Sequence, residues 1–263
     1  MIDTHCHLAD KRFDKDRAHV FDRARVAGIS HFIEIAYAPH IIPKAHELAA
    51  AHPALFLAVG VHPSESGRVP PSWLDELRSA ARHPRVVAIG ETGLDFFRDH
   101  AARAEQEWWF RAQLALADEV GLPVVIHQRS ALEDTLAILE SHRPRAGGVL
   151  HCFDDGPEAV ERARGIGFKL GIGGCLTYGH EALEAAVRMA PEDMLVLETD
   201  APYLEPEPRV LKRNEPGLLT RLLPKLRELR GWDPEQADRI TTANSRALFR
   251  FPTGDPPTAL PGE

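Results

Sequence analysis

The sequence has few cysteines, no long apolar run and no excess of positive charge. The three cysteines, Cys6, Cys152 and Cys175, lie far apart in the 263-residue chain, so we expect a reducing environment and no disulfide framework. No apolar run is long enough to cross a bilayer. The first residues contain acids and histidines instead of a basic segment followed by an apolar one, so we predict no signal peptide, no membrane association and a cytoplasmic location.

The shortage of positive charge limits the possible partners. Lysine and arginine number 31 against 39 aspartate and glutamate, which gives a formal net charge of −8. This balance argues against a protein that tracks along nucleic acid through an extended basic surface. It leaves open an enzyme in which bound metal ions supply positive charge locally. The apolar share of 44% and the charged share of 27% are typical of globular proteins.

Eight short segments of β type alternate with helical segments along the chain. The expected strands are residues 1–7, 31–36, 55–61, 86–90, 124–127, 148–151, 168–172 and 194–199, and helical segments between them include 14–27, 104–120, 132–141 and 180–189. Several of the expected strands are continuous apolar runs, as buried parallel strands are. Eight alternations in roughly 250 residues predict an α/β fold of the closed (β/α)₈ TIM barrel type, with a doubly wound open sheet as the alternative.

We predict a single barrel domain over residues 1–251, because no repeat, low-complexity segment or internal linker interrupts the alternation. A last helix is expected to begin after Asp233, an N-cap acid followed by Pro234 at the first helical position and Gln236 three residues after the cap. This helix should end near Phe249. Residues 252–263 contain four prolines, two glycines and little to bury, which predicts a mobile tail.

The most informative short motif lies at the start of the chain. His5 and His7 are two residues apart, so on a strand both imidazoles point to the same face, while Cys6 points to the other. Imidazole is the commonest protein ligand for divalent metals, although a His-x-His pair also occurs by chance on surfaces. Asp3 shares the face of the two histidines, where it can orient a ligand or serve a turn.

Further acids and imidazoles occur at the ends of later expected strands. Barrel enzymes build their active sites at the carboxyl ends of the strands, and a single His or Glu there is more often structural than functional. Six candidate ligands at one rim are too many for one tetrahedral zinc, and they suit two divalent ions that share a bridging carboxylate. These candidates are His5, His7, Glu91, His127, His151 and Asp200.

Seven motifs, in order, resemble those of the TatD family of metal-dependent hydrolases. They are Asp3-Thr-His-Cys-His, Gly60-Val-His-Pro, Gly90-Glu-Thr-Gly-Leu-Asp, His127-x-Arg129, His151-Cys-Phe, Thr199-Asp-Ala-Pro and Arg213-Asn-Glu-Pro, and they extend from Met1 to about Phe249. The resemblance implies a TIM barrel of the amidohydrolase type. It also implies a metal-dependent deoxyribonuclease, often an exonuclease that acts from the 3′ end and so uses single-stranded DNA or 3′ ends.

The same resemblance implies two divalent ions, such as Mg²⁺, Zn²⁺ or Mn²⁺. One ion would be held by His5, His7, Glu91 and Asp200, and the other by Glu91, His127 and His151, with Glu91 as the bridge. The chain departs from the family pattern beside these residues. Ser130 stands where the family usually has Asp, Asp154-Asp155 where Ser-Gly is common, and Val210-Leu211 where Arg-Gly is frequent. These departures bear on substrate preference.

Phosphodiester hydrolysis requires a nucleophilic water and charge relief on the phosphoryl oxygens, which two metal ions can supply. With Glu91 as the bridging catalytic carboxylate, Asp200 is the candidate general base, because a strand-end Asp at a metal can accept the proton of that water; the alternative is a ligand role only. His62 either binds a phosphate or caps its loop. Arg129 and Arg213 are candidates to pair with phosphate oxygens in a forked geometry.

Three further residues lie near these candidates, and two other functions compete with the nuclease. Asn214 follows Arg213 in its motif and is included with it as a candidate substrate-binding residue, without an assigned role. Phe96 and Phe97 either stack on an unpaired base or pack. A small-molecule amide, ester or lactone hydrolase on the same barrel is the main alternative. A non-catalytic interaction protein would require lost ligands, and all six candidates are present.

Overall fold

The computed structural model describes residues 1–98 and 100–252, and its centre is a single eight-stranded parallel sheet. The strands follow one another in chain order from β1 to β8. A bridge between Cys6 and Ala201 joins the end of β1 to the segment after β8. The strands are β1 (Ile2–Cys6), β2 (His31–Ala36), β3 (Leu55–Val59), β4 (Val86–Asp95), β5 (Val124–Arg129), β6 (Gly148–Leu150), β7 (Phe168–Ile172) and β8 (Leu195–Leu197).

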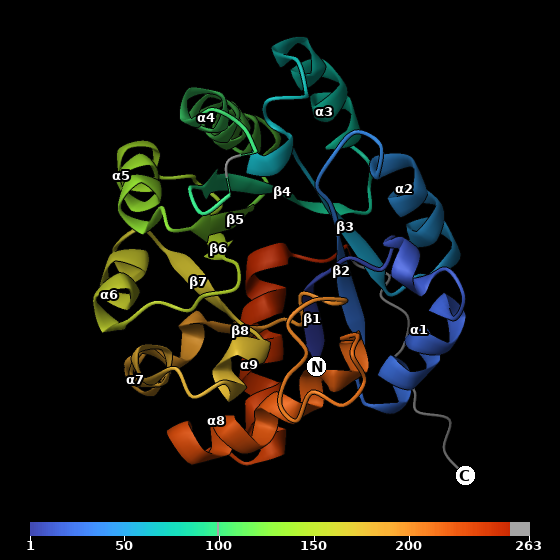
Figure 1. Ribbon diagram of the computed structural model, residues 1–263, viewed down its shortest axis with the longest axis vertical. Coiled ribbons are helices and arrows are strands. Elements are labelled where there is room, and N and C mark those ends of the chain that lie inside the picture. The colour runs from blue at the N-terminus through green and yellow to red at the C-terminus, as the bar shows by residue number, and fades with distance from the viewer. Residues whose placement is uncertain (99, 253–263) are drawn as a thin grey trace.

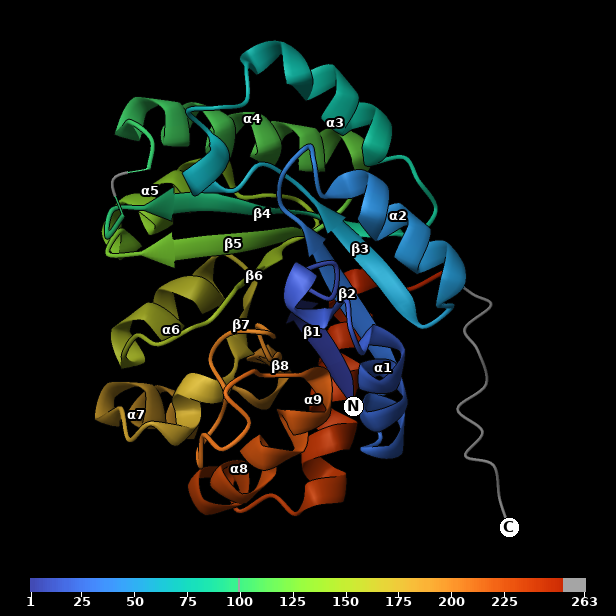
Figure 2. The same cartoon turned by 45° about the vertical axis from the view of Figure 1, so that its right-hand side comes forward.

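Helices surround this sheet, as Figure 1 shows, and the strands run with their carboxyl ends toward one side (Figure 2). The sequential strand order confirms the predicted (β/α)₈ barrel and rules out the doubly wound alternative, because strand order reverses direction in such sheets. The helices are α1 (Arg17–Val26), α2 (Ile42–Ala51), α3 (Leu74–Ala80), α4 (Arg103–Val120), α5 (Leu132–His142), α6 (Pro157–Gly165), α7 (Glu181–Met189), α8 (Leu223–Arg230) and α9 (Pro234–Phe249).

Two apolar layers hold the barrel together. The larger layer lies between the strands and the surrounding helices, and the smaller one fills the barrel interior with residues such as Ile33, Ile35 and Val125. Leu248, near the end of α9, packs into the interior layer. Cys6 belongs to the outer layer, where its thiol donates to the Ile33 carbonyl, so the prediction that it faces away from the histidines is confirmed.

The strands β3 and β4 end at different residues from those expected. β3 ends at Val59 because the backbone of Val61 pairs with the side-chain amide of Gln113 instead of a neighbouring strand. β4 extends five residues beyond the predicted end at Gly90, because its second half pairs with β5, with Asp95 opposite Arg129. Glu91 therefore lies within a strand and not after one, which corrects the sequence-based prediction.

Within residues 1–98 and 100–252, no helix has the length and apolar content needed to span a membrane. The four predicted helical segments correspond to α1, α4, α5 and α7, with ends that differ by at most three residues. The tail predicted at residues 252–263 lies outside the described part of the chain except for Pro252.

The predicted start of the last helix is confirmed. The side chain of Asp233 accepts a hydrogen bond of 2.8 Å from the backbone N–H of Gln236, and Pro234 occupies the first helical position. The helix then carries Ala237, Leu248 and Phe249 into the buried layers. Loss of the cap at the first turn of α9 is therefore expected to weaken the packing of this helix in the barrel.

We predict that Asp233→Ala lowers the free energy of unfolding by about 1 kcal/mol, because the first turn of α9 loses its side-chain cap. Denaturant unfolding monitored by circular dichroism measures the difference. Asp233→Asn is the matched control, since Asn caps helices about as well as Asp and should leave stability close to that of the unchanged protein. Equal losses in both variants would show that the carboxylate charge matters and not the cap.

Candidate active site and metal centre

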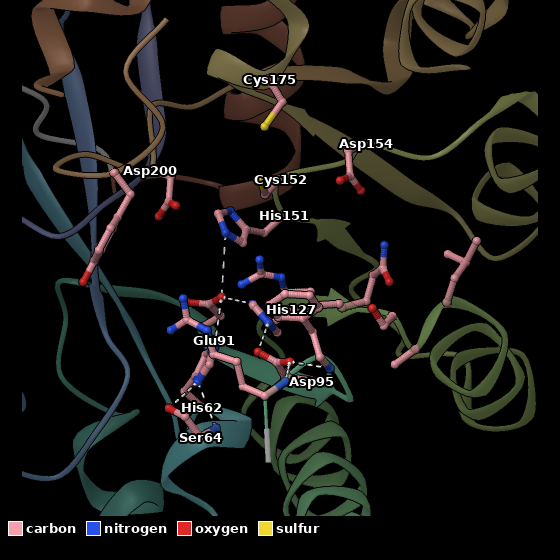
Figure 3. Close-up of a pocket in the computed structure, with 18 of the residues that line it drawn as sticks. His62, Ser64, Glu91, Asp95, His127, His151, Cys152, Asp154, Cys175 and Asp200 are labelled. Atoms are coloured by element: carbon pink, nitrogen blue, oxygen red, sulfur yellow. Dashed lines mark hydrogen bonds and ion pairs between the residues drawn. The ribbon is translucent and has the colours of Figure 1, made fainter. Parts of the chain in front are cut away.

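A pocket of 1140 Å³ opens at the carboxyl ends of the strands. Five of the six predicted ligands line it, and Figure 3 shows Glu91, His127, His151 and Asp200 around its floor. The sixth, His5, is fully buried beneath the others. The structure thus brings together all six residues that the strand-end pattern singled out: His5, His7, Glu91, His127, His151 and Asp200.

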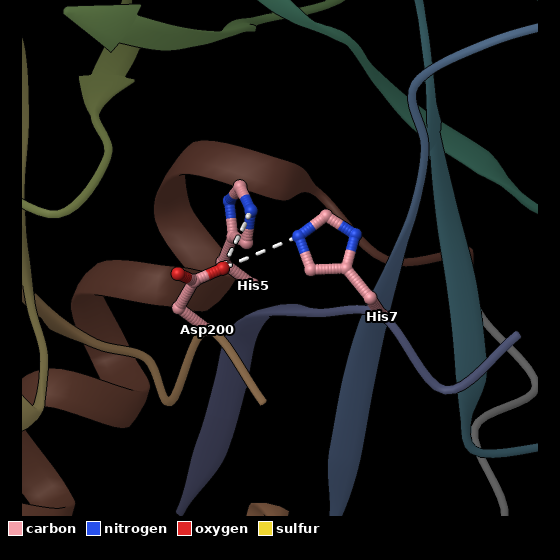
Figure 4. Close-up of side chains that lie close together, drawn as sticks. All are labelled: His5, His7 and Asp200. Carbon is pink, nitrogen blue, oxygen red and sulfur yellow. Dashed lines mark ion pairs between the residues drawn. The ribbon is translucent and has the colours of Figure 1, made fainter. Parts of the chain in front are cut away.

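The two histidines of β1 and its following residues converge on Asp200. The Nε2 atoms of His5 and His7 lie 3.6 Å and 3.2 Å from the same oxygen, Oδ1 of Asp200 (Figure 4). Three ligand atoms from these residues all lie within 4.8 Å of one another, close enough to hold one ion. The spacing of two along an extended chain, which predicted a shared face, is the reason the two imidazoles reach one carboxylate.

Glu91 lies at the centre of the site. Its Oε1 accepts from Nδ1 of His127 at 2.8 Å and lies 3.7 Å from Nε2 of both His62 and His151. Its Oε2 lies 3.5 Å from Nε2 of His5. One buried carboxylate thus faces imidazoles from four parts of the barrel.

The charges around Glu91 set the protonation states of the site. Burial alone would raise the pKa of Glu91, but the surrounding imidazoles, led by His62, hold it well below its ordinary range. Burial opposes the charge of His151, yet Glu198 and Glu91 outweigh it and raise the pKa of His151 to about 10. Burial, reinforced by His127, lowers the pKa of His62 to about 3. Glu91 is therefore ionised at neutral pH.

The donor set fits divalent metal ions. Both ring nitrogens of His5 are buried and have no hydrogen-bond partner among the described residues. A buried polar atom without a partner costs about 1–3 kcal/mol, so a ligated ion accounts for an arrangement that hydrogen bonds do not. Imidazole nitrogens together with carboxylate oxygens suit zinc and manganese, and the carboxylates also suit magnesium.

Glu198 is a site residue that the sequence-based reasoning missed. Its Oε1 lies 2.8 Å from Nδ1 of His151 and accepts from the backbone N–H of Cys152 at 2.6 Å. Gly171 on β7 makes room for it, because any side chain at that position would overlap the Glu198 carboxylate. Glu198 lies two residues before Asp200 in the sequence. This spacing could have indicated a site residue, since alternate residues of an extended segment share a face.

Two other buried carboxylates hold the backbone of the site. Asp3 accepts from the hydroxyl of Thr199 at 2.6 Å and from the backbone N–H groups of Thr199 and His5. Of the two roles considered for Asp3, it therefore orients main chain and not an imidazole ring. Glu34, which the sequence did not single out, accepts from the N–H groups of Leu8 and Ala9 and so fixes the loop after His7.

Of the two roles predicted for His62, the structure shows the capping role. Its Nδ1 accepts from the backbone N–H of Ser64 at 3.0 Å and so caps the short 3₁₀ helix Pro63–Glu65. Its Nε2 faces the pocket, 3.7 Å from Oε1 of Glu91. The capping role is therefore present in the structure, and the ring keeps one nitrogen directed at the space where a substrate would lie.

The predicted substrate-binding residues separate into two groups. Arg129 is exposed at the end of β5 and lines the pocket. Arg213 does not line it: its guanidinium forms two hydrogen bonds to Asp16, at 2.7 Å and 2.8 Å. Asn214 is buried, and its amide donates to the carbonyls of Thr199 and Leu204. Arg213 and Asn214 thus stabilise the loop after β8, and we do not include them in the substrate site.

The two phenylalanines after Asp95 also differ. Phe96 is partly buried, packs against the outer core and carries the guanidinium of Arg103 over its ring at 3.8 Å. Phe97 lines the pocket and is 62% exposed. Packing therefore describes Phe96, whereas Phe97 presents an aromatic ring to the pocket.

A parallel (β/α)₈ barrel with imidazoles and carboxylates gathered at the carboxyl ends of its strands defines the class of barrel metal-dependent hydrolases. The family model described as "TatD related DNase" matches residues 2–250. The chain belongs to this family of metal-dependent hydrolases, which confirms the resemblance seen in the motifs.

Known proteins of the family are similar over nearly their whole length. The "3'-5' ssDNA/RNA exonuclease TatD" of Cronobacter sakazakii is 38% identical over 260 residues, which cover 95% of this chain and 97% of that protein. An "uncharacterized metal-dependent hydrolase", YabD of Bacillus subtilis, is 34% identical over 253 residues, covering 95% and 99%. The crystal structure of a TatD homologue from Escherichia coli, YjjV, superimposes with a TM-score of 0.91 at 31% identity, covering 96% and 98%.

We predict that Arg213→Gln lowers the free energy of unfolding at neutral pH by no more than about 1 kcal/mol, because its ion pair with Asp16 is partly exposed. Arg213, with help from Arg23, lowers the pKa of Asp16. A depressed pKa stabilises the fold above the unfolded value of about 3.9 and loses this effect as the pH falls through the folded value.

The difference in unfolding free energy between Arg213→Gln and the unchanged protein should therefore be largest near pH 7 and shrink below about pH 4. Denaturant unfolding at both pH values, with metal content from elemental analysis, provides the measurement. Metal content should stay unchanged. A variant that unfolds normally but loses metal would place Arg213 at the pocket.

Proposed function

We propose that residues 1–251 form a single barrel domain that acts as a divalent-metal-dependent exonuclease, removing nucleotides from the 3′ end of single-stranded DNA. The observation that supports this most directly is the ring of imidazoles around Glu91 in an open pocket. Similar proteins, 38% and 36% identical to this chain, carry the name "3'-5' ssDNA/RNA exonuclease", which supports the substrate class. All six ligand candidates are in place, which disfavours a non-catalytic role.

In this proposal two metal ions occupy the site. His5, His7 and Asp200 would hold one, His127 and His151 the other, and Glu91 would bind both. When bound, such ions relieve charge on the phosphoryl oxygens and lower the pKa of water so that hydroxide is available near pH 7. The residues of the chain keep the ligands in position: Glu198 holds the His151 ring, and Asp3 holds the main chain of His5.

Asp200 is our candidate general base. Its carboxylate lines the pocket, and its side chain is 15% exposed, so that it faces both the ligand imidazoles and the substrate space. Burial would raise the pKa of Asp200, but the hydrogen bond from His7 and the neighbouring imidazoles lower it. Asp200 is therefore ionised at neutral pH and can accept a proton from the attacking water.

We propose that Arg129 and His62 contact substrate phosphates. Among residues 1–98 and 100–252, no carboxylate forms an ion pair with Arg129, so its charge is available to a phosphate oxygen. His62 directs Nε2 into the same pocket. With a net charge of −8 and so few local cations, the protein should hold DNA mainly at the site and not along an extended groove.

The direct test uses metal-loaded protein with single-stranded DNA, double-stranded DNA, RNA and a panel of lactones, before and after exhaustive chelation. We expect fastest cleavage of single-stranded DNA, loss of activity on chelation and its return with a divalent ion. Binding of the ion should also weaken in acid, because imidazoles ligate only when neutral. Full turnover by protein shown to be metal-free, or activity confined to lactones, would overturn the proposal.

A second prediction separates the roles of Glu91 and Asp200. Glu91→Gln removes an anionic ligand from both proposed ions, so metal content and activity should fall together. Asp200→Asn keeps an oxygen ligand but cannot accept a proton at neutral pH. This variant should keep most of its metal and its DNA affinity, while kcat falls on the order of 10²–10⁴-fold.

Elemental analysis, DNA affinity and turnover are measured side by side for the two variants. If Asp200→Asn loses metal as completely as Glu91→Gln, Asp200 acts chiefly as a ligand. If Asp200→Asn keeps its metal and turns over at a normal rate, the proton goes to another group, and His62 is the next candidate.

A further inference from the structure

An exposed aromatic ring lies beside the metal-ligand cluster and has no part in it. Phe97 is 62% exposed, although an aromatic ring of this size normally buries most of its apolar surface. It lines the pocket together with Glu91 and His127. Its exposed surface is therefore open to a ligand in the pocket.

Hydrogen bonds hold the backbone that carries this ring beside the site. The N–H groups of Phe97 and Arg98 both donate to Oδ1 of Asp95 at 3.0 Å. The other oxygen of Asp95 lies 3.4 Å from Nε2 of His127 (Figure 3). One buried carboxylate therefore connects the backbone of the turn that carries Phe97 to an imidazole of the ligand cluster.

A cation covers part of the Phe97 ring. The guanidinium carbon of Arg129 lies 4.0 Å from the ring centroid. The parallel register of β4 and β5 places them together, because Asp95 is opposite Arg129 and the N–H of Phe96 donates to the Arg129 carbonyl. With 62% of Phe97 exposed, aromatic surface remains open to solvent beside the cation.

Two tyrosines that line the same pocket, Tyr203 and Tyr178, also carry an arginine over the ring, and a comparison with them singles out Phe97. The cations of these stacks are already neutralised by ion pairs at 2.9 Å and 3.0 Å. The two stacks are Arg12 over Tyr203, where Arg12 pairs with Asp10, and Arg209 over Tyr178, where Arg209 pairs with Glu207. Within the described part of the chain, Arg129 has no carboxylate partner, so its stack alone of the three keeps its charge for a phosphate.

We propose that Phe97 is a specificity residue whose ring stacks on the unpaired base of a nucleotide that flanks the scissile phosphate, while Arg129 beside it takes that nucleotide's phosphate. An aromatic face next to a guanidinium that has no carboxylate partner among the described residues is the combination that recognises a base and its backbone charge together. A paired base shows no open face, so stacking on Phe97 favours single strands. This inference rests on the proposed nuclease function and specifies its substrate contact.

The test compares Phe97→Ala with the unchanged protein on a single-stranded oligodeoxynucleotide and on two versions that lack a base at the 3′-terminal or the penultimate position. Phe97→Ala should raise KM roughly 5- to 150-fold on the intact strand, the usual worth of one base stacked on an aromatic ring. Its kcat should change little, because stacking stabilises the bound ground state and the transition state equally. On one of the abasic strands the two proteins should have the same KM.

Three further variants control the measurement. Phe97→Trp keeps a stacking face and should retain a near-normal KM, whereas Phe97→Leu keeps apolar volume without that face and should behave like Phe97→Ala. Trp108→Ala removes an aromatic side chain that is 42% exposed on α4 and does not line the pocket, and it should change nothing. Arg129→Gln should flatten the salt dependence of KM by about one phosphate contact, a slope of roughly 0.7, which Phe97→Ala should not do.

The failure of this inference is distinct from failure of the proposed function. If the unchanged protein cleaves no nucleic acid, the proposed nuclease function and the stacking role of Phe97 are both wrong. If the protein cleaves nucleic acid and Phe97→Ala has the same KM as the unchanged protein, only the stacking role of Phe97 is wrong. The same conclusion follows from a KM penalty of equal size on the intact strand and on both abasic strands, because it would show that Phe97 shapes the pocket without touching a base.

Discussion

The site depends on a single buried carboxylate surrounded by imidazoles. Glu91 is 3% exposed, and an isolated negative charge at that depth would be strongly unfavourable. The surrounding rings offset this cost either as imidazolium ions or, when neutral, by holding divalent cations with it. Protons and metal ions therefore compete for the same arrangement, which couples the charge of the site to its occupancy.

The barrel makes this arrangement possible. No local segment can bring a carboxylate within reach of rings from β1, β5 and the residues after β3 and β6, but the carboxyl ends of parallel strands in a closed barrel all face one space. The apolar layer inside the barrel supports the site from below. Around it, Asp3 and Glu34 fix the main chain through hydrogen bonds, and Glu198 forms an ion pair with the ring of His151 before any substrate arrives.

The sequence predicted those features that depend on periodicity and strand ends. The alternation of segments predicted the barrel, and the spacing of two between His5 and His7 predicted their shared direction. It did not predict contacts between distant segments. Arg213 was a plausible phosphate ligand until the fold placed Asp16 beside it, 197 residues earlier in the chain. The predicted strand at residues 86–90 ended before Glu91, and only the pairing with β5 shows that the strand continues to Asp95.

The charge distribution explains how an acidic chain can act on a polyanion. The pocket wall carries Asp154, Asp155 and Glu133, and burial, together with Asp154, raises the pKa of Asp155 to about 6. Such a wall repels a long run of phosphates. Attraction then comes from the few places where a bound ion, or a cation such as Arg129 with no carboxylate partner in residues 1–98 and 100–252, faces the pocket. The end of a DNA strand can bind through those few contacts alone, whereas binding along a continuous duplex would require an extended basic surface. The same acidity that excludes tracking along DNA is therefore compatible with an enzyme that works from strand ends.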